Sequence, residues 1–287
     1  MRTRVQAWRN ADPSRSGLPD LPLPPAPMPP WRGSRPLKAW TWVGAFGPDV
    51  MLCAAVARIG PATSAWWAVW DRAAGRLVER TARRSRGIEV SAGRVRVHGV
   101  LDLSVGGGAA IEVVSPHGRH YAWTRKHGGV RVRGTAIVDG RELAVDAPGL
   151  VDESAGYHAR HTAWRWSAGA GVAASGEPVA WNLVAGLHDA PEASERTVWV
   201  AGEPREVGPV TFGGEAVDGT PPNLAAVGFA DGGGLRFTAE ATRCRRENLL
   251  LVRSAYEQPF GTFTGELPGV GPLREGFGVM ERHDVLW

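Results

Sequence analysis

The chain has 287 residues, of which 43% are hydrophobic and 22% charged, and it carries a formal net charge of +4. These values are typical of a globular protein with room for one large domain or two smaller ones, and no run of about 18 apolar residues is present that could span a membrane. All the cationic residues except Lys38 and Lys126 are arginines, many alternating with apolar residues, and no recognised nucleic-acid-binding motif accompanies them, so no nucleic-acid partner is expected.

The first segment of the chain is rich in proline. Residues 12–36 contain nine prolines, and such a stretch forms neither a helix nor a β-ladder. We therefore expect residues 1–36 to be an N-terminal arm that lies extended over the surface, with ordered structure beginning near Leu37. A ligand for an SH3-type domain is the functional alternative.

The next part of the chain has the pattern of short β-strands bounded by turn residues. Asp139-Gly140 predicts a two-residue hairpin turn of the primed type. Leu52–Ile59 fits either a short helix or a buried strand. The strands expected before residue 149 include Ala65–Val69, Ile88–Val90, Val95–Val97 and Val130–Arg133.

The second half repeats this pattern, and it ends on an apolar run that we expect to be a closing strand. A boundary at Asp146–Gly149 would divide the chain into halves of residues 37–149 and 150–287. Because short strands are dense throughout, the predicted fold class is all-β, with two consecutive antiparallel barrels or sandwiches and few short helices. The strands expected in this half include Val179–Ala185, Thr197–Val200, Leu235–Ala239, Leu249–Arg253 and Phe260–Gly265.

The segment from Gly156 to Asp189 is too polar for an ordinary core and too aromatic for an ordinary surface. Aromatic side chains with polar groups suit a concave pocket that holds an apolar molecule and orients it by a few hydrogen bonds. The candidate substrate-binding residues are Trp164, Trp166, Trp181, Asn182 and His188. Trp164 and Trp166 are two positions apart and share one face of an expected strand, which core packing alone would also explain.

The same segment offers groups for proton transfer. A histidine near neutrality, or a carboxylate whose pKa is raised by burial, is suited to acid–base catalysis. The candidate catalytic residues are Tyr157, His158, His161 and Asp189. The alternatives are histidines that are hydrogen-bonded inside a polar pocket, and an Asp189 that caps a turn.

A metal site is the other interpretation of these histidines. His158 and His161 lie three positions apart, so in an extended strand they face opposite sides and would bind one zinc or iron ion only across a bend. The third ligand would be His188, Asp189 or Glu153. Because the stronger helical and cysteine-based spacings are absent, we expect no metal and no cofactor.

Cysteine usage and the N-terminus bear on the compartment. Cys53 and Cys244 match no metal or redox spacing, so we expect both to be reduced core residues. The basic start lacks an apolar segment typical of a secretory signal, and we predict a cytoplasmic protein. The sequence specifies no oligomeric state and allows a peripheral contact with a membrane.

Four segments together resemble the bacterial family of domains of unknown function 2804. They are Pro30–Arg32 with the following Leu37–Trp40, Tyr157–Trp166, Trp181–Val184 and Glu275–Gly278, and the resemblance spans Pro29–Trp287. The family name implies no activity. More distantly, the chain resembles the paired lipocalin-like barrels of carotenoid hydratases, tocopherol cyclases and related cyclases. This resemblance implies lipocalin-like halves, a long apolar substrate held in a barrel, and acids or tyrosines that act without a redox cofactor.

These observations lead to one expected function and two alternatives. We expect binding and cofactor-independent hydration, isomerisation or cyclisation of a lipophilic isoprenoid- or lipid-like molecule. A non-catalytic carrier or sequestering protein for such a molecule is the main alternative. A nucleic-acid-binding regulator would require Arg80–Arg86 to form one exposed basic face.

Overall fold

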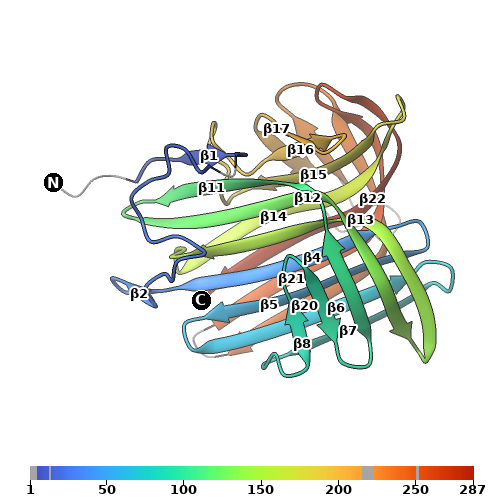
Figure 1. Ribbon diagram of the computed structural model, residues 1–287, viewed down its shortest axis with the longest axis horizontal. Helices are drawn as coiled ribbons and strands as arrows, with labels where there is room; N and C mark the ends of the chain where they lie inside the picture. The colour runs from blue at the N-terminus through green and yellow to red at the C-terminus, as the bar shows by residue number, and fades with distance from the viewer. Residues whose placement is uncertain (1–4, 13, 215–222, 250–251) are drawn as a thin grey trace.

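The structure is a computed structural model that describes residues 5–12, 14–214, 223–249 and 252–287 (Figure 1). Every regular element among these residues is a β-strand, so the predicted all-β class is confirmed and the few expected helices do not occur in them. Leu52–Ile59 lies within a strand, which decides between the two interpretations of that segment. Within the described ranges, no helix is long and apolar enough to cross a membrane.

The N-terminal half forms an antiparallel sheet of eleven strands. Its strands are β1 (Trp8–Asn10), β4 (Lys38–Phe46), β5 (Val50–Ile59), β6 (Ala62–Asp71), β7 (Arg76–Ala82), β8 (Ile88–Val90), β9 (Arg94–Val97), β10 (Leu101–Gly106), β11 (Ala109–His117), β12 (His120–Val138) and β13 (Arg141–Gly156). The order is β7-β6-β5-β4-β13-β12-β10-β9-β8, and β11 pairs with β12 and β1. A separate hairpin joins β2 (Trp31–Arg32) to β3 (Arg35–Pro36).

The C-terminal half forms a second antiparallel sheet of nine strands. They are β14 (His161–Ala173), β15 (Pro178–Ala185), β16 (Thr197–Val200), β17 (Glu203–Glu206), β18 (Val210–Gly213), β19 (Ala226–Phe229), β20 (Gly234–Leu249), β21 (Val252–Leu267) and β22 (Gly271–Leu286). Their order is β17-β16-β15-β14-β22-β21-β20-β19-β18, which places the C-terminal strand β22 in the middle of the sheet.

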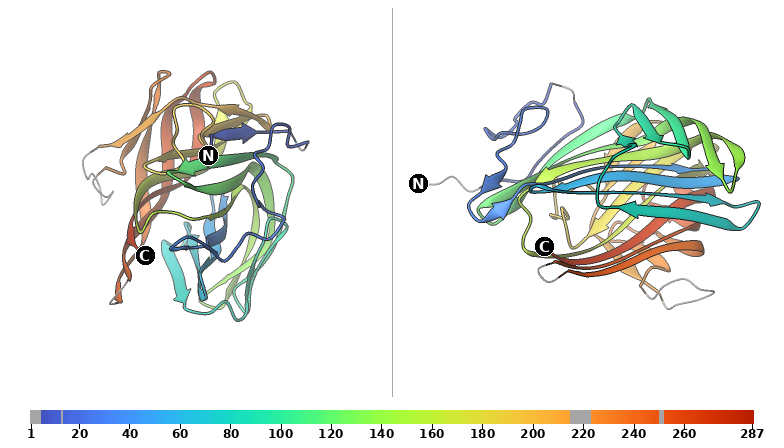
Figure 2. Two further views of the ribbon diagram at one scale, coloured as in Figure 1. Left: turned by 90° about the vertical axis from the view of Figure 1, so that its left-hand side faces the viewer. Right: turned by 90° about the horizontal axis from the view of Figure 1, so that it is seen from below.

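Each sheet curls around an apolar core of its own (Figure 2). In the first sheet, β8 packs against β4 and β5, and in the second β15 packs against β18. Alternation along the strands decides which side chains enter these cores: Val95 and Val97 of β9 are buried, whereas Arg94 and Arg96 are exposed. The interior of each curled sheet is therefore filled by the protein's own apolar side chains.

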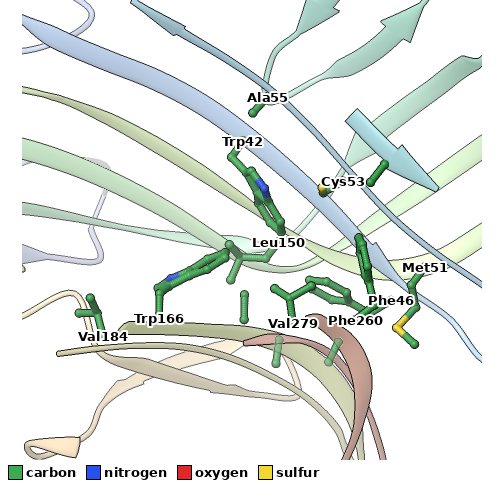
Figure 3. Packing of buried hydrophobic residues seen from close by; sticks show 14 of the residues in the cluster. Trp42, Phe46, Met51, Cys53, Ala55, Leu150, Trp166, Val184, Phe260 and Val279 are labelled. Atoms are coloured by element: carbon green, nitrogen blue, oxygen red, sulfur yellow. The ribbon is translucent and has the colours of Figure 1, made fainter. Parts of the chain in front are cut away.

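A third apolar cluster joins the outer faces of the two sheets (Figure 3). The indole of Trp42 on β4 meets that of Trp166 on β14 edge to face, with ring centroids 5.0 Å apart. Phe260 and Val279 are fully buried in the same cluster. At the edge of the cluster, Trp70 Nε1 donates a hydrogen bond of 2.9 Å to the carboxylate of Glu240. The two sheets therefore share one continuous interface.

The proline-rich arm packs on the first sheet. Regular structure begins at β1, well before the expected Leu37, because β1 adds to the free edge of β11. The side chain of Leu23 is buried, and the Tyr121 hydroxyl donates to the carbonyl oxygen of Pro22 at 3.0 Å. The Tyr157 hydroxyl donates to the carbonyl oxygen of Pro29 at 2.7 Å. Tyrosine side chains thus hold the arm in place.

The change from one sheet to the other falls at residues 157–160, and the boundary expected at residue 149 lies within β13. β13 pairs with β12 along its whole length, and with β4 only from Gly149 onward. Pro148, which has no N–H to donate, thus comes just before the pairing with β4 begins. The proline marks the end of a ladder rather than a linker.

Three further predictions from the sequence can be compared with the structure, and their outcomes differ. Asp139 and Gly140 have positive φ values of 49° and 80°, which confirms the primed turn. Cys53 is buried as expected, but Cys244 is exposed, because it faces outward between two arginines of β20. Of the strand expected at Leu249–Arg253, residues 250 and 251 lie outside the described residues, and the flanking positions end β20 and begin β21.

Phe260→Ala tests the interface between the sheets. Truncating a fully buried phenylalanine removes apolar burial and leaves a cavity, so the free energy of unfolding should fall by about 3 to 5 kcal/mol. Ile137→Ala, at an exposed position, should change it by less than about 0.5 kcal/mol. Urea denaturation followed by tryptophan fluorescence measures both. A small effect of Phe260→Ala would show that the sheets do not depend on this contact.

Candidate functional site

A cavity of about 190 Å³ lies between the two sheets, next to the Trp42–Trp166 contact. Indole rings dominate its walls, and ionisable side chains interrupt them. The tryptophans that line it are Trp40, Trp42 and Trp66 from the first sheet and Trp164, Trp166 and Trp287 from the C-terminal half. The half-exposed side chains of Arg245 and Glu247 line it where it approaches the surface.

One row of cross-strand neighbours builds the first wall. Lys126 of β12 is paired with Asp152 of β13, and Asp152 with Trp42 of β4. Trp42 is paired with Ala55 of β5, and Ala55 with Trp66 of β6. Because directly paired residues lie on the same face of a sheet, the whole row faces the second sheet.

Strict alternation along β22 builds the opposite wall. Glu281, His283 and Val285 are two positions apart and all line the cavity. Trp164 of β14 and Tyr256 of β21 are both paired with His283, one on each side, so their rings flank the same spot. Three adjacent strands thus place aromatic and acidic groups on one surface.

Glu281 is the best-placed acid in this wall. Its carboxyl group accepts a hydrogen bond of 2.8 Å from Trp164 Nε1 and another of 2.8 Å from Gln258 Nε2. The side chain is buried, and burial raises its pKa to about 7, because neutral donors compensate only part of the lost hydration. Glu281 therefore has both protonation states available near neutral pH, as a general acid or base requires.

Groups around Glu281 are held in defined charge states. Burial raises the pKa of Tyr256 well above its ordinary value, so its hydroxyl stays protonated. The guanidinium of Arg243 lies 4.8 Å from the centre of the Tyr256 ring and forms an ion pair with Glu79 at 3.0 Å. His283 accepts or donates a hydrogen bond of 2.8 Å with Ser254 Oγ, and burial lowers its pKa to about 3, which keeps it neutral.

A second ionisable cluster lies at the other end of the cavity. Lys126 Nζ is 2.5 Å from a carboxylate oxygen of Asp152 and 3.4 Å from one of Glu195. Burial alone would lower the pKa of Lys126, but the two carboxylates more than offset this and raise it. Burial raises the pKa of Glu195. The cluster is thus a charged lysine hydrogen-bonded to Asp152, with Glu195 able to take up a proton.

Three histidines meet beside this cluster. The rings of His117, His158 and His188 have centroids 5.3 to 5.4 Å apart in every pair. His158 Nε2 lies 3.3 Å from His188 Nε2. Burial lowers the pKa of His117 to about 4 and the pKa values of His158 and His188 well below the ordinary value, so the three imidazoles are neutral.

Of the substrate-binding residues expected from the sequence, Trp164, Trp166 and His188 line the cavity. Asn182 lies behind the wall: its side-chain oxygen accepts from Trp166 Nε1 at 2.8 Å, and its side-chain nitrogen donates to the carbonyl oxygen of Glu195 at 2.8 Å. Trp181 points into the core of the second sheet and donates to Ser167 Oγ. Asn182 therefore orients two residues of the wall.

The structure does not gather the four expected proton-transfer residues in one place. Tyr157 is fully buried beneath the arm, and His158 belongs to the three-histidine group. His161 is 62% exposed and contacts Asp284 at 2.9 Å, so the two histidines of this pair face apart. Asp189 is exposed and accepts a hydrogen bond from the backbone N–H of Gly186, as a turn-capping residue does.

Sequence reasoning did not single out Glu281, Tyr256 or the Lys126 cluster. The sequence predicted a closing strand here, and only the pairing of β22 with two neighbouring strands shows that Glu281 and His283 face inward. One signal was available. Lys38 and Lys126 are the only lysines in an arginine-rich chain, and both are buried.

Comparison with known proteins identifies the family. Residues 78–287 match the family described as Domain of unknown function (DUF2804), and the chain belongs to this family. The predicted membership is thereby confirmed, although the match begins later than the expected Pro29. No curated protein matches the chain.

Solved structures resemble this chain to different degrees. A protein assigned as AttH from Nitrosomonas europaea is 12% identical, with a TM-score of 0.53 over 91% of this chain and 98% of that one. Kievitone hydratase from Nectria haematococca is 10% identical, with a TM-score of 0.48 over 85% of this chain and 88% of that one. CghA in complex with Sch210972 is 12% identical, with a TM-score of 0.41 over 93% and 95%. The first of these likenesses supports the fold.

The raised pKa of Glu281 predicts a specific dependence of stability on pH. Between about pH 4.5, its ordinary pKa, and pH 7, the folded protein keeps a proton that the unfolded chain has lost. The stabilisation is complete below about pH 4.5 and is lost as the pH rises to about 7, a difference of about 3 kcal/mol at 1.4 kcal/mol per pKa unit.

Urea denaturation over this pH range should therefore show that Glu281→Gln removes the corresponding fall in stability. Glu275→Gln, the same change at an exposed position of β22, should leave the fall as it is in the unsubstituted protein. Parallel curves for Glu281→Gln and the unsubstituted protein would contradict the assignment of a raised pKa to Glu281.

Proposed function

We propose that the protein binds a compact lipophilic molecule between its two sheets and converts it by acid–base chemistry, with Glu281 transferring the proton. The observation that carries this proposal is a carboxyl group with a pKa near 7 in the wall of a cavity lined by tryptophans. The reaction class is hydration, isomerisation or cyclisation of an isoprenoid- or lipid-like substrate.

The cavity supports an apolar and compact substrate. Its volume of about 190 Å³ is below the roughly 300 to 1,000 Å³ typical of small-molecule pockets. A short unsaturated isoprenoid or a small polycyclic molecule fits this size better than the long chain implied by the distant resemblance. The faces of Trp42, Trp66 and Trp166 supply apolar contact, and indole faces also stabilise a positive charge that develops on carbon.

The proton-transfer step follows from the surroundings of Glu281. The protonated carboxyl group donates its proton to a carbon–carbon double bond, and positive charge develops on the neighbouring carbon. The resulting carboxylate is held by the N–H groups of Trp164 and Gln258. In an isomerisation, the carboxylate takes a proton from an adjacent carbon. In a hydration, water adds its oxygen to the cation and returns a proton to Glu281.

Tyr157, His158, His161 and Asp189 were the proton donors expected from the sequence. Within the described part of the chain, none of the four lines the cavity, and this favours Glu281 for the role. His188, Trp164 and Trp166 do line it and are retained as substrate-binding residues. Lys126 with Glu195 is positioned to act as a second proton carrier at the far end.

The alternative is a carrier that binds the same kind of molecule and converts nothing. An apolar cavity alone would serve that role. Placing ionisable groups in a sheet interface costs free energy unless they are fully compensated, and Glu281 is compensated only by neutral donors. A catalyst requires a buried carboxyl group with a raised pKa, whereas a carrier does not. The state of Glu281 therefore favours an enzyme over a carrier.

The first experiment identifies a ligand. Native mass spectrometry of the purified protein, followed by solvent extraction, reports any copurifying lipid, and a panel of small isoprenoids and lipids is then tested by tryptophan fluorescence. We expect ligand binding to quench tryptophan fluorescence. Trp166→Ala should weaken the binding of the ligand, because this indole forms part of the cavity wall. If no member of the panel binds, both the enzyme and the carrier lose their support.

The second experiment separates the enzyme from the carrier. With a ligand that is converted, Glu281→Gln should lower turnover at least about 10²-fold while leaving affinity within a few fold, because the amide keeps the shape of the carboxyl group but cannot transfer a proton. Glu275→Gln is the matched control on the same strand and should turn over normally. His158→Ala and Asp189→Asn are measured beside them. If either substitution abolished turnover while Glu281→Gln stayed active, the assignment of proton transfer to Glu281 would be wrong. Binding without conversion by the unsubstituted protein would establish the carrier.

A further inference from the structure

Three histidines from separate parts of the chain converge beside the cavity. His117 ends β11, His158 lies between β13 and β14, and His188 lies in the loop between β15 and β16. One ring nitrogen from each residue can be chosen so that all three lie within 4.8 Å of one another. His188 is held with a positive φ of 53°, a backbone conformation that L-residues adopt uncommonly.

The spacing of the rings fits coordination of a single ion. Imidazoles bound to zinc by bonds of about 2.0–2.1 Å in tetrahedral geometry have their bonded nitrogens about 3.3 Å apart and their ring centres about 5 Å apart. His158 Nε2 and His188 Nε2 are 3.3 Å apart, and the three pairs of ring centroids are 5.3 to 5.4 Å apart. His117 contributes a ring nitrogen that lies within 4.8 Å of one nitrogen of each of the other two rings.

Hydrogen bonding leaves this group incompletely satisfied. In the part of the chain that the structure describes, His117 Nε2 and His188 Nδ1 are buried without a hydrogen-bond partner. A neutral imidazole has one donor and one acceptor, and a buried group left unpaired is destabilising. The contact between His158 and His188 satisfies only one pair. A metal ion would use a lone pair from each of the three rings at once.

Charges around the group have both signs. Lys38 Nζ donates to the carbonyl oxygens of His158 and Ala159 at 3.2 and 3.1 Å, and Arg35 adds positive charge that also disfavours a cation. The carboxylate of Asp189 acts in the opposite direction at His117. Binding of a cation here therefore depends on direct coordination by nitrogen, which selects an ion that binds imidazole well over calcium or magnesium.

We propose that His117, His158 and His188 bind one divalent transition-metal ion, with Zn²⁺ as the ion that this donor set fits best. Three protein ligands leave one tetrahedral position open. His188 also lines the cavity, so the bound ion would lie at the edge of the site that contains Glu281. This inference does not rest on the proposed function, and it replaces the His158–His161 pairing with a ligand set in which His117 takes the place of His161.

The test measures metal binding rather than activity. Protein freed of metal with a chelator is titrated with Zn²⁺ by calorimetry, and with Co²⁺ by visible absorption, which reports tetrahedral coordination. We expect one ion per chain and a rise in melting temperature with Zn²⁺, because an ion that binds the folded state stabilises it. His117→Ala, which changes the partly exposed ligand, should weaken binding at least about tenfold and abolish the rise.

His98→Ala is the matched control, because His98 is exposed on the first sheet and remote from the three-histidine group in the topology. It should bind metal like the unsubstituted protein. Circular dichroism of the metal-free variants shows whether each is folded. If His117→Ala is not, His188→Gln provides the second test of the same ligand set. Binding of less than one ion per chain, or equal binding by a folded ligand variant, would overturn the site and leave only surface histidines as ligands.

Discussion

The apolar contact between the two curled sheets is the interaction on which both the architecture and the candidate site depend. Each sheet already encloses a core of its own, so this contact is not needed to close either of them. Instead, the edge-to-face packing of Trp42 on Trp166 places the wall that carries Lys126 opposite the wall that carries Glu281. Without this contact, the carboxyl groups of Glu281 and Glu195 would be hydrated. Their raised pKa values, whose largest cause is burial, would then return toward the ordinary value.

The buried ionisable groups at this interface differ in how they are compensated, and the difference decides their charge. Lys126 has two carboxylates within 3.4 Å and stays charged despite complete burial. Arg243 has Glu79. Glu281 accepts hydrogen bonds from the neutral N–H groups of Trp164 and Gln258, and burial outweighs them. An interface can therefore hold permanent charges for structure and titratable acids for chemistry within the same apolar surface.

Much of the fold could be predicted from local patterns. Alternation identified strands such as Val95–Val97, and Asp139-Gly140 identified its turn, because both depend on neighbours in the chain. The polar and aromatic segment from Gly156 to Asp189 contributes Trp164, Trp166 and His188 to the cavity wall in the structure. Glu281 could not be found in this way. Its alternation with His283 was visible, but nothing local showed which face of β22 would meet another sheet.

By itself, the sequence determined an all-β chain and a supply of indole and imidazole groups in one segment. Strand periodicity and turn chemistry are short-range properties, so they are legible residue by residue. Only the tertiary structure decided burial, because burial depends on contacts between residues far apart in the chain. His158 and His161 are three positions apart, yet one is buried and the other faces water, whereas His117, His158 and His188 converge from three segments.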